Sequence, residues 1–256
     1  MSIFTSALRK INLVSLLFTK RYLSINRYYL SDNFWAFKKN YIGKSSVNER
    51  LYMLLESNNF ANINLLQIGA HNGKDNNVVS IRALATLPNT TIVLVEPNPV
   101  VFEELVSAYS NTKNVSCVNV AISTVSGVQD FYTVIANDSL PSWANQLSSF
   151  DKQQILKSSV EIPSIEDFIV KHQVACEMYK DVVDSHLGGH AHVVLIDVEG
   201  FDADIVCSMN LQSSQPVIIY FEHKHLVASK FREAISFLSD YGYSFTHSEF
   251  DTLAYK

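Results

Sequence analysis

Two apolar runs, each followed by a turn, constrain the fold of this chain more than any other feature. The first is LLQIGAHNG (65–73), which ends in a small-residue turn, and the second is VLVEPNP (93–99), which ends in an acid. They are separated by about 25 residues, the spacing of a nucleotide-binding βαβ unit, in which a carboxylate after the second strand accepts hydrogen bonds from ribose hydroxyls. The pattern therefore predicts that Glu96 binds the ribose of an adenosine-like ligand.

The turn itself indicates which adenosine-like ligand fits. A dinucleotide needs a glycine pattern that lets the backbone close on its pyrophosphate. This turn has Gly69 and Gly73 but lacks the intermediate glycine, and His71 would crowd a pyrophosphate. S-adenosylmethionine has no phosphate, so the turn favours it over NAD. An ordinary strand-to-helix turn is the simplest alternative.

Length, charge and cysteine content bound the class of protein. With 256 residues, 47% of them hydrophobic, the chain can form one substantial α/β domain with appendages. The net charge is −5, but residues 1–40 carry seven basic residues and one acid, which leaves −11 for the rest. An acidic body argues against nucleic acid as a partner. Three scattered cysteines fit a reducing compartment without a structural zinc site.

The first 45 residues read as a basic helical extension that precedes a domain over 46–256. The uncharged run 11–19 is too short to span a bilayer, which needs ~20 apolar residues. Three interpretations stay open, in this order: a helix packed on the domain, a weak anchor on the membrane surface, or an organellar presequence. We expect a cytoplasmic protein, peripheral to the membrane in the second case.

The order of the expected elements predicts a Rossmann-like fold. Expected strands alternate with expected helices, which indicates a mostly parallel sheet with helices on both faces. An antiparallel pair closes the chain. A further strand at 126–136 is expected to extend the sheet or pair locally, and the irregular insert 137–159 reads as a lid. The expected strands are 62–68, 91–96, 115–121, 192–198 and 216–222, the closing pair is 243–247 and 252–255, and the expected helices are 46–59, 75–86, 99–109, 164–172, 202–209 and 229–241.

Polar residues gather where the fourth and fifth strands end. Asp197 and Glu199 follow the fourth strand, and Glu222, His223 and His225 follow the fifth. The carboxyl ends of parallel strands meet at one rim, where ligands bind. Asp197, Glu222 and His223 are the candidates for a catalytic base. Helix capping by Asp197 and a solvated turn at Glu199 are the simpler readings.

The histidines at 186, 190 and 192 have a spacing that resembles a metal site. They precede the fourth strand, at the opposite edge of the sheet from the rim. We therefore interpret them as surface residues.

A series of motifs in order and spacing resembles the FkbM family of S-adenosylmethionine-dependent methyltransferases. The resemblance covers about residues 46–256, and the run LIDVEGFDADIV is its most specific part. The other motifs are QIGAHNGKDN, VEPNP, NVAIS, QLSSFDKQQIL, IPSIEDFI, PVIIYFEHKHL and YGYSF.

The resemblance implies a class I methyltransferase fold and methyl transfer from S-adenosylmethionine, usually to a hydroxyl oxygen. The acceptor would be a small molecule or a glycan: a sugar, a polysaccharide or a secondary metabolite. The matching motifs give each residue an expected role. Gly69, Ala70 and Gly73 would shape the methionine end of the cofactor site, and Glu96 would hold the ribose. Asn119 and Ala121 would lie near the adenine, and Asp197 and Glu199 would face the methionine amine, the sulfonium or the acceptor. Gln67 and His71 depart from the usual residues at their positions and bear on methionine binding.

Other functions stay open at this point. One is a metal-dependent enzyme with Asp197, Glu199, Glu222 and His225 as ligands, although we expect no metal for the methyl transfer itself. Another is a cofactor-binding protein of the same fold without catalysis. An NAD enzyme is the most distant alternative.

Overall fold

The computed structural model describes residues 47–57, 62–73, 81–86 and 89–256. The expected extension 1–45, and with it the three interpretations of that segment, lies outside these residues. Two compact units divide the chain, one of residues 1–62 with 75–90 and one of residues 63–74 with 91–256. The described helices of the first unit are α4 (Val47–Ser57) and α5 (Ile81–Leu84), which fall within the helices expected at 46–59 and 75–86.

The second unit is built on a seven-stranded sheet in the order β10-β11-β9-β8-β1-β2-β3. β8 pairs in parallel with β1 and β9, β2 pairs in parallel with β3, and β11 runs antiparallel to β9 and β10. The predicted α/β fold, mostly parallel with an antiparallel C-terminal pair, is confirmed. The strand bounds are β1 (Ile63–Ile68), β2 (Thr90–Val95), β3 (Val115–Val118), β8 (Val193–Ile196), β9 (Ile218–Glu222), β10 (Ser244–His247) and β11 (Asp251–Tyr255).

The chain reverses its direction of travel across the sheet between β1 and β8. From β1 the chain moves outward to β2 and β3, then returns to place β8 on the other side of β1. In open parallel sheets, ligands bind at this switch point, beyond the carboxyl ends of the strands. The topology therefore directs attention to the tips of β1, β2, β8 and β9.

Burial on both faces explains why the central strands read as continuous apolar runs. Leu66 and Ile68 join a core with the helices α8 (Tyr179–Leu187), α9 (Asp202–Ser208) and α10 (Ala228–Asp240). Leu65 and Val193, whose side chains alternate to the other face, are buried as well. Such burial is typical of parallel sheets, and it leaves the strand tips as the places for polar side chains.

Helix α6 (Pro99–Tyr109) matches its predicted bounds because its start is encoded locally. Asn98 accepts a hydrogen bond from the Val100 N–H through its side chain, and Pro99 occupies the first helical position. Both are strong helix-start signals. The helix thus begins within three residues of Glu96, which fixes the backbone on that side of the rim.

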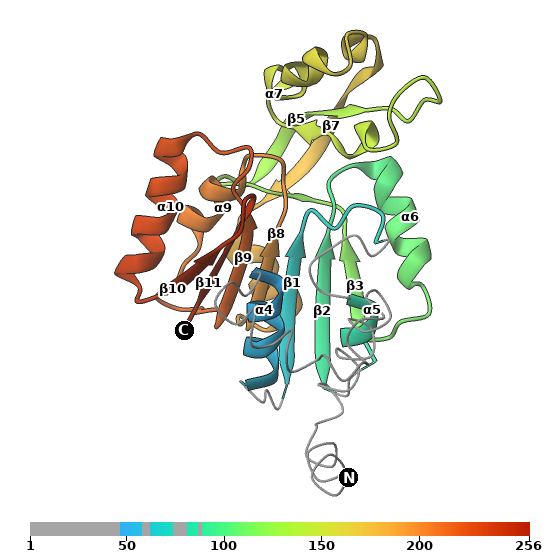
Figure 1. Cartoon of the computed structure of the whole chain (residues 1–256). Coiled ribbons are helices and arrows are strands. Elements are labelled where there is room, and N and C mark those ends of the chain that lie inside the picture. Colours follow the sequence, from blue (N-terminus) through green and yellow to red (C-terminus); the bar gives the residue numbers. More distant parts are fainter. Residues whose placement is uncertain (1–46, 58–61, 74–80, 87–88) are drawn as a thin grey trace, which may run out of the picture. The chain divides into compact units, whose positions relative to one another are not determined.

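A second, four-stranded sheet has the order β4-β7-β5-β6. β5 (Gly127–Val134) and β7 (Ile169–Glu177) pair antiparallel over their length, β4 (Ala121–Ile122) lies beside β7, and β6 (Ser148–Ser149) lies beside β5. Figure 1 shows this sheet beyond the tips of β1 and β2. The strand expected at 126–136 is therefore present, but it belongs to a separate sheet.

The helix expected at 164–172 is wrong. Only a 3₁₀ turn, η5 (Ile165–Phe168), forms there, and β7 follows it directly. The segment IVKHQVACE alternates in burial and contains several β-branched residues, which favours a strand once β5 is available to pair with it. Helix α8, which follows β7, was not predicted.

The insert 137–159 is folded rather than irregular. It contains η3 (Ala144–Gln146), β6, α7 (Lys152–Leu156) and the start of η4 (Lys157–Val160). Ala144 and Ile155 are buried in a small core with Val134, Ile162 and Ile165. The insert thus has a hydrophobic core of its own next to the strand tips.

No helix among the described residues combines the length and the apolar character that crossing a bilayer requires.

Candidate functional site

The turn after β1 ties together the tips of three strands. The N–H groups of Gly69 and Ala70 both donate to the carbonyl oxygen of Val95, at 3.0 and 2.9 Å, and the Asp197 N–H donates to the Ile68 carbonyl at 3.0 Å. Gly69 has φ +81°, and a Cβ built on it would lie 1.8 Å from the Asp197 carbonyl oxygen. Only glycine allows this approach of β1 to β8.

Glu96 is buried at the tip of β2, with both carboxylate oxygens held by backbone groups. Oε2 accepts a hydrogen bond from the His71 N–H at 2.8 Å, and Oε1 accepts one from the Asn98 N–H at 2.8 Å. Burial raises the pKa of Glu96 to about 7, opposed by these two hydrogen bonds and increased by the charge of Asp197. Each oxygen keeps capacity to accept a second hydrogen bond, which suits the two hydroxyls of a ribose.

His71 reaches Glu96 through its backbone rather than its ring. It has φ +48°, a left-handed conformation, in the turn that the Gly73 N–H closes on the Ala70 carbonyl at 3.1 Å. A Cβ on Gly73 would lie 2.5 Å from the Tyr109 ring. The turn 69–73 is thus held by strand tips on one side and by α6 on the other.

The other residues expected around the cofactor fall into two groups. Asn119 lies at this rim, where its Nδ2 donates to the carbonyl oxygens of Glu96 at 2.8 Å and Pro97 at 3.2 Å. Gln67 is buried within β1 and Ala121 is buried against Phe131 in the core of the second sheet. The structure therefore assembles Gly69, Ala70, His71, Gly73, Glu96 and Asn119, while the roles expected for Gln67 and Ala121 stay predictions.

A second set of carboxylates follows β8 and β9. Burial raises the pKa of Glu199 to about 7, with a further contribution from the charge of Asp197. Burial and the same charge raise the pKa of Glu222 to about 8. Asp197 is exposed, yet the protein around it removes enough water to raise its pKa, and Asp251 acts in the same direction. These acids therefore bind protons more tightly than ordinary carboxyls.

Asp202 is a buried carboxylate that sequence reasoning did not include in the site. It is fully buried at the first position of α9, its Oδ2 accepts the Gly200 N–H at 3.1 Å, and burial raises its pKa to about 7. The signal was available, because acidic residues are favoured in the first turn of a helix and Asp202 begins the helix predicted at 202–209. It fixes the loop that carries Glu199.

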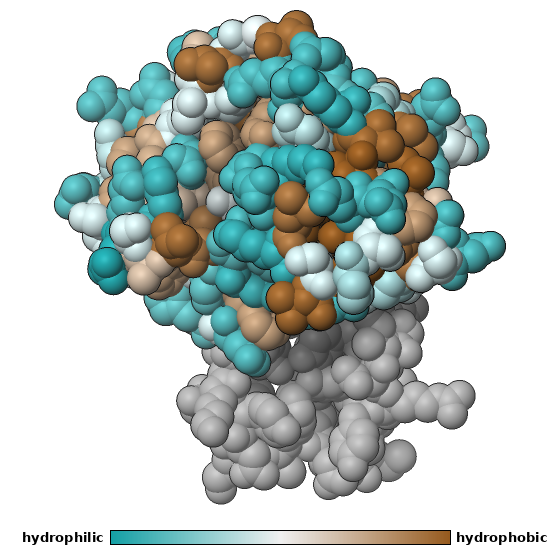
Figure 2. All heavy atoms as spheres, turned by 90° about the horizontal axis from the view of Figure 1, so that it is seen from above, coloured by the Kyte–Doolittle hydropathy of each residue, from teal (hydrophilic) through white to brown (hydrophobic). Residues whose placement is uncertain are grey.

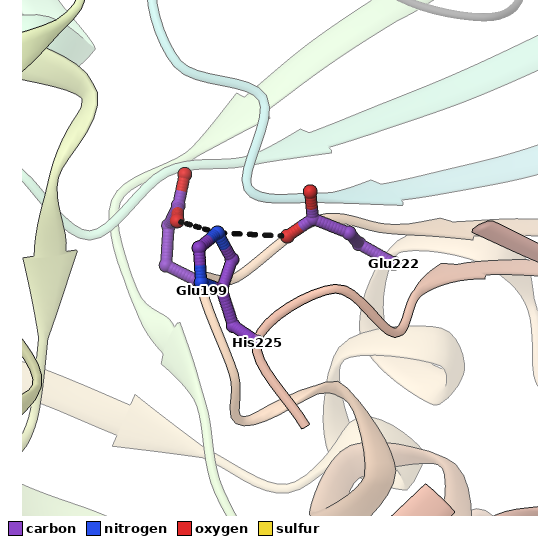
Figure 3. A group of neighbouring side chains, drawn as sticks. All are labelled: Glu199, Glu222 and His225. Atoms are coloured by element: carbon purple, nitrogen blue, oxygen red, sulfur yellow. Dashed lines mark ion pairs between the residues drawn. The ribbon is translucent and has the colours of Figure 1, made fainter. Parts of the chain in front are cut away.

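His225 joins Glu199 and Glu222 in one cluster (Figure 3). Its Nε2 lies 3.2 Å from Glu199 Oε2 and 3.7 Å from Glu222 Oε2. Together these three residues offer one ligand atom each within 4.8 Å of one another. Asp197, which the metal-site interpretation included, is not part of this group, because its side chain extends into solvent instead.

His223 makes its contacts elsewhere. Its N–H donates to the Phe250 carbonyl at 2.7 Å, its Nδ1 lies 2.9 Å from Thr252 Oγ1, and its ring packs against Phe231 of α10. These contacts direct the ring toward β11 and α10. The catalytic role expected for His223 stays a prediction.

The histidines before β8 lie where the sequence placed them, at the amino end of that strand. His192 Nδ1 accepts a hydrogen bond from the Asn64 N–H at 3.0 Å, and the His190 carbonyl accepts one from Asn64 Nδ2 at 2.9 Å. Their local hydrogen bonds connect β8 to the start of β1.

The insert contacts the loop that carries Glu199. The rings of Phe150 and Phe201 are 5.5 Å apart, and Phe150 also packs against Phe131 at 5.3 Å. A Cβ on Gly200 would lie 3.2 Å from Gln154 Nε2 of α7. The loop 199–201 is thus covered by the insert rather than by solvent alone.

The surface above the strand tips is mixed in character. Figure 2 shows apolar side chains scattered among hydrophilic ones on this face. Exposed apolar residues of the insert and its flanks include Ile135, Trp143 and Val160. Apolar residues scattered in this way are ordinary on a protein surface and do not by themselves mark a binding site.

Comparison with known proteins gives a family and several structures of related architecture. A family model described as the methyltransferase FkbM domain matches residues 67–245. The FkbM methyltransferase from Methylobacillus flagellatus KT is 12% identical with a TM-score of 0.46, and the match covers 87% of this chain and 59% of that one. Fibrillarin from Aeropyrum pernix, solved with natively bound S-adenosyl-L-methionine, is 11% identical with a TM-score of 0.40, covering 75% and 65%.

A precorrin-6y C5,15-methyltransferase from Geobacter metallireducens GS-15 is 14% identical with a TM-score of 0.40, covering 83% and 90%. No curated protein matches the sequence. The family model includes the turn after β1, Glu96, the second sheet and the cluster of Glu199, Glu222 and His225. The chain therefore belongs to the FkbM methyltransferase domain family.

Proposed function

We propose that this protein transfers the methyl group of S-adenosylmethionine to a hydroxyl oxygen of a sugar, a polysaccharide or another secondary metabolite. Membership of the FkbM domain family supports methyl transfer. The observation that carries the cofactor assignment is Glu96, a buried carboxylate with both oxygens oriented by backbone N–H groups of the turns after β1 and β2.

The residues around Glu96 fit a phosphate-free adenosyl ligand. S-adenosylmethionine carries its methyl group on a positively charged sulfur. An attacking oxygen bonds to the methyl carbon, and the electron pair of the broken carbon–sulfur bond stays on the sulfur. Glu96 accepts hydrogen bonds from the ribose, and the turn 69–73 borders the methionine end. The close approach of Gly69 to the Asp197 carbonyl leaves the turn too tight for a side chain, consistent with a ligand that lies against the backbone.

The acceptor hydroxyl must lose a proton, and Asp197 is our preferred recipient. Its side chain is exposed at the rim, where an acceptor enters, and its raised pKa makes it a better base than an ordinary aspartate. Glu222 is the second candidate, although its Oε2 is enclosed. A positioned base contributes ~10²–10⁴-fold to the rate.

The acceptor site is proposed to lie between the rim and the insert. The contacts among Phe131, Phe150 and Phe201 hold the insert against the loop 199–201. Trp143 belongs to the same insert and is partly exposed. The exposed ring of Trp143 is the aromatic face that could pack against the apolar face of a sugar ring. The acidic charge of residues 41–256 supports a neutral or cationic acceptor and disfavours nucleic acid.

Three measurements test this function. Isothermal titration should detect binding of S-adenosylhomocysteine but not of NADH, and labelled S-adenosylmethionine should label hydroxyl-bearing glycans in an extract. Asp197→Asn should lower kcat by ~10²-fold or more with little effect on binding of S-adenosylhomocysteine. Absence of binding would refute the cofactor assignment, and binding without turnover on any acceptor would identify a non-catalytic cofactor-binding protein.

A further inference from the structure

The cluster of Glu199, Glu222 and His225 joins residues from two neighbouring strand tips. Glu199 lies in the loop between β8 and α9, Glu222 is the last residue of β9, and His225 follows three residues later. Their side chains point toward one another in Figure 3. All three are partly buried, so water reaches the cluster from part of its surroundings only.

The distances in the cluster match the coordination sphere of a small cation. His225 Nε2 lies 3.2 Å from Glu199 Oε2 and 3.7 Å from Glu222 Oε2. Ligand atoms bound tetrahedrally at about 2.1 Å from a zinc ion are about 3.4 Å apart, between these two values. The two separations that involve His225 therefore fit an ion with side-chain adjustments of a few tenths of an ångström, and the third lies within 4.8 Å.

One oxygen in the cluster lacks the partner that its burial requires. Glu222 Oε2 is closed off from solvent and has no hydrogen bond, since the 3.7 Å separation from His225 Nε2 is too long for one. A buried carboxylate oxygen without a donor is costly, and buried charges are normally paired or coordinate metals. An ion bound at the centre of the cluster would give this oxygen the partner that it lacks.

The charges around the cluster also favour a cation. Asp197, Glu199 and Asp202 all act on Glu222 as negative neighbours. Lys224 is the positive neighbour that acts on Asp197, Glu199 and Glu222, and Lys157 acts on His225 from the insert. Together with the two glutamates of the cluster itself, four carboxyl groups thus face two lysines.

We propose that Glu199, Glu222 and His225 bind one divalent transition-metal ion that accepts mixed oxygen and nitrogen ligands, with Mn²⁺ and Zn²⁺ as the probes. Imidazole suits Zn²⁺ and carboxylates suit Mn²⁺, and three protein ligands leave positions for water or a substrate oxygen. An acceptor hydroxyl bound at an open position would be oriented next to Asp197. This role in acceptor binding rests on the proposed methyl transfer, whereas binding of the ion does not.

The test is ion binding to the full chain after removal of metals with a chelator, without S-adenosylmethionine. Isothermal titration with Zn²⁺, and electron paramagnetic resonance with Mn²⁺, should detect one site per chain. Glu222→Gln and His225→Ala should each weaken binding at least tenfold. Circular dichroism and thermal unfolding verify that each variant folds, and Glu199→Gln serves as a further variant if one does not.

Two matched controls separate the cluster from other ligands. His190→Ala removes a histidine from the opposite end of β8, and Glu103→Gln removes an exposed carboxylate from α6. Both should bind the ion as the wild type does. Absence of ion binding, or binding that is unaffected by Glu222→Gln and His225→Ala, would identify the cluster as an ion pair only and overturn the proposal.

The two proposals can fail separately. Titration of the same preparation with S-adenosylhomocysteine reports on the cofactor site. Ion binding without cofactor binding would leave the metal site standing and refute the methyl transfer, and cofactor binding without ion binding would do the reverse.

Discussion

Glu96 and Glu222 lie at the ends of β2 and β9, on the same rim but with β1 and β8 between them, and they differ in what holds them. Each oxygen of Glu96 receives a backbone N–H at 2.8 Å, whereas Oε2 of Glu222 has no hydrogen bond and faces a histidine. Burial raises the pKa of both, to about 7 and about 8. Both carboxyl groups are therefore enclosed, and they differ in their partners: backbone N–H groups hold Glu96, whereas a histidine faces Glu222.

The largest effect should come from the turn beneath Glu96. Gly69→Ala would place a Cβ 1.8 Å from the Asp197 carbonyl at φ +81°. We expect the free energy of unfolding in urea to fall by about 3 kcal/mol or more, because backbone on two strands must move apart.

Gly242→Ala is a matched control, since Gly242 also has φ +81° but a Cβ there would meet nothing within 4 Å. It should cost about 1–2 kcal/mol from backbone strain alone. Equal losses of stability in the two variants would show that position 69 requires glycine because of its positive φ, and not because β1 approaches β8 closely.

The next largest effect should be on cofactor affinity, and it should differ between Glu96 and Glu222. Glu96→Gln should weaken binding of S-adenosylhomocysteine by about 10–100-fold, because hydrogen bonds to a charged group contribute about 1.5–3 kcal/mol. Glu222→Gln should change the affinity by less than about threefold. Isothermal titration measures both, and similar losses in the two variants would contradict the division of the rim into two sites.

A smaller effect concerns pH. The pKa values of Glu96, Glu199 and Asp202 are raised to about 7 and that of Glu222 to about 8, so the folded protein keeps protons that the unfolded chain has released. The free energy of unfolding should therefore fall as pH rises from about 5 to 8, by roughly 2–3 kcal/mol for each of these carboxyls taken alone.

Urea unfolding of metal-free protein at several pH values measures this slope. Glu222→Gln should flatten the curve between pH 7 and 8, where that carboxyl loses its proton. A wild-type curve that stays level or rises over this range would show that these carboxyls are better solvated than the structure indicates.

The smallest effect is expected at Asn119. Asn119→Ala removes hydrogen bonds to the carbonyl oxygens of Glu96 and Pro97, which should lower the free energy of unfolding by about 1 kcal/mol and weaken cofactor binding several-fold. Asn210→Ala, at an exposed position, should change the stability by less than about 0.5 kcal/mol. Loss of stability without loss of cofactor affinity would confine Asn119 to a structural role.

Much of the fold could be predicted because its signals are local. The apolar runs of β1, β2, β8 and β9 and the Asn98–Pro99 helix start are recognisable from a few consecutive residues. β7 could not be predicted, since its strand character depends on pairing with β5, some 40 residues earlier in the chain. Helix α8 was missed along with it.

In the candidate site too, some features follow from local sequence and others depend on contacts between distant segments. The sequence by itself determined that Glu96, Glu199, Glu222 and His225 follow strand ends, because each lies directly after an apolar run and parallel strands end at one rim. It also determined that the turn 69–73 contains glycine at the two positions where a side chain would collide with neighbouring strands or helices.

Only the tertiary structure decided which of these side chains meet. Glu222 and His223 are adjacent, yet pairing of β9 with β11 and packing of α10 direct His223 toward Thr252 and Phe231 while Glu222 joins Glu199 and His225. The direction of a side chain at a strand end depends on backbone contacts with distant segments. The order of residues along one strand does not contain that information.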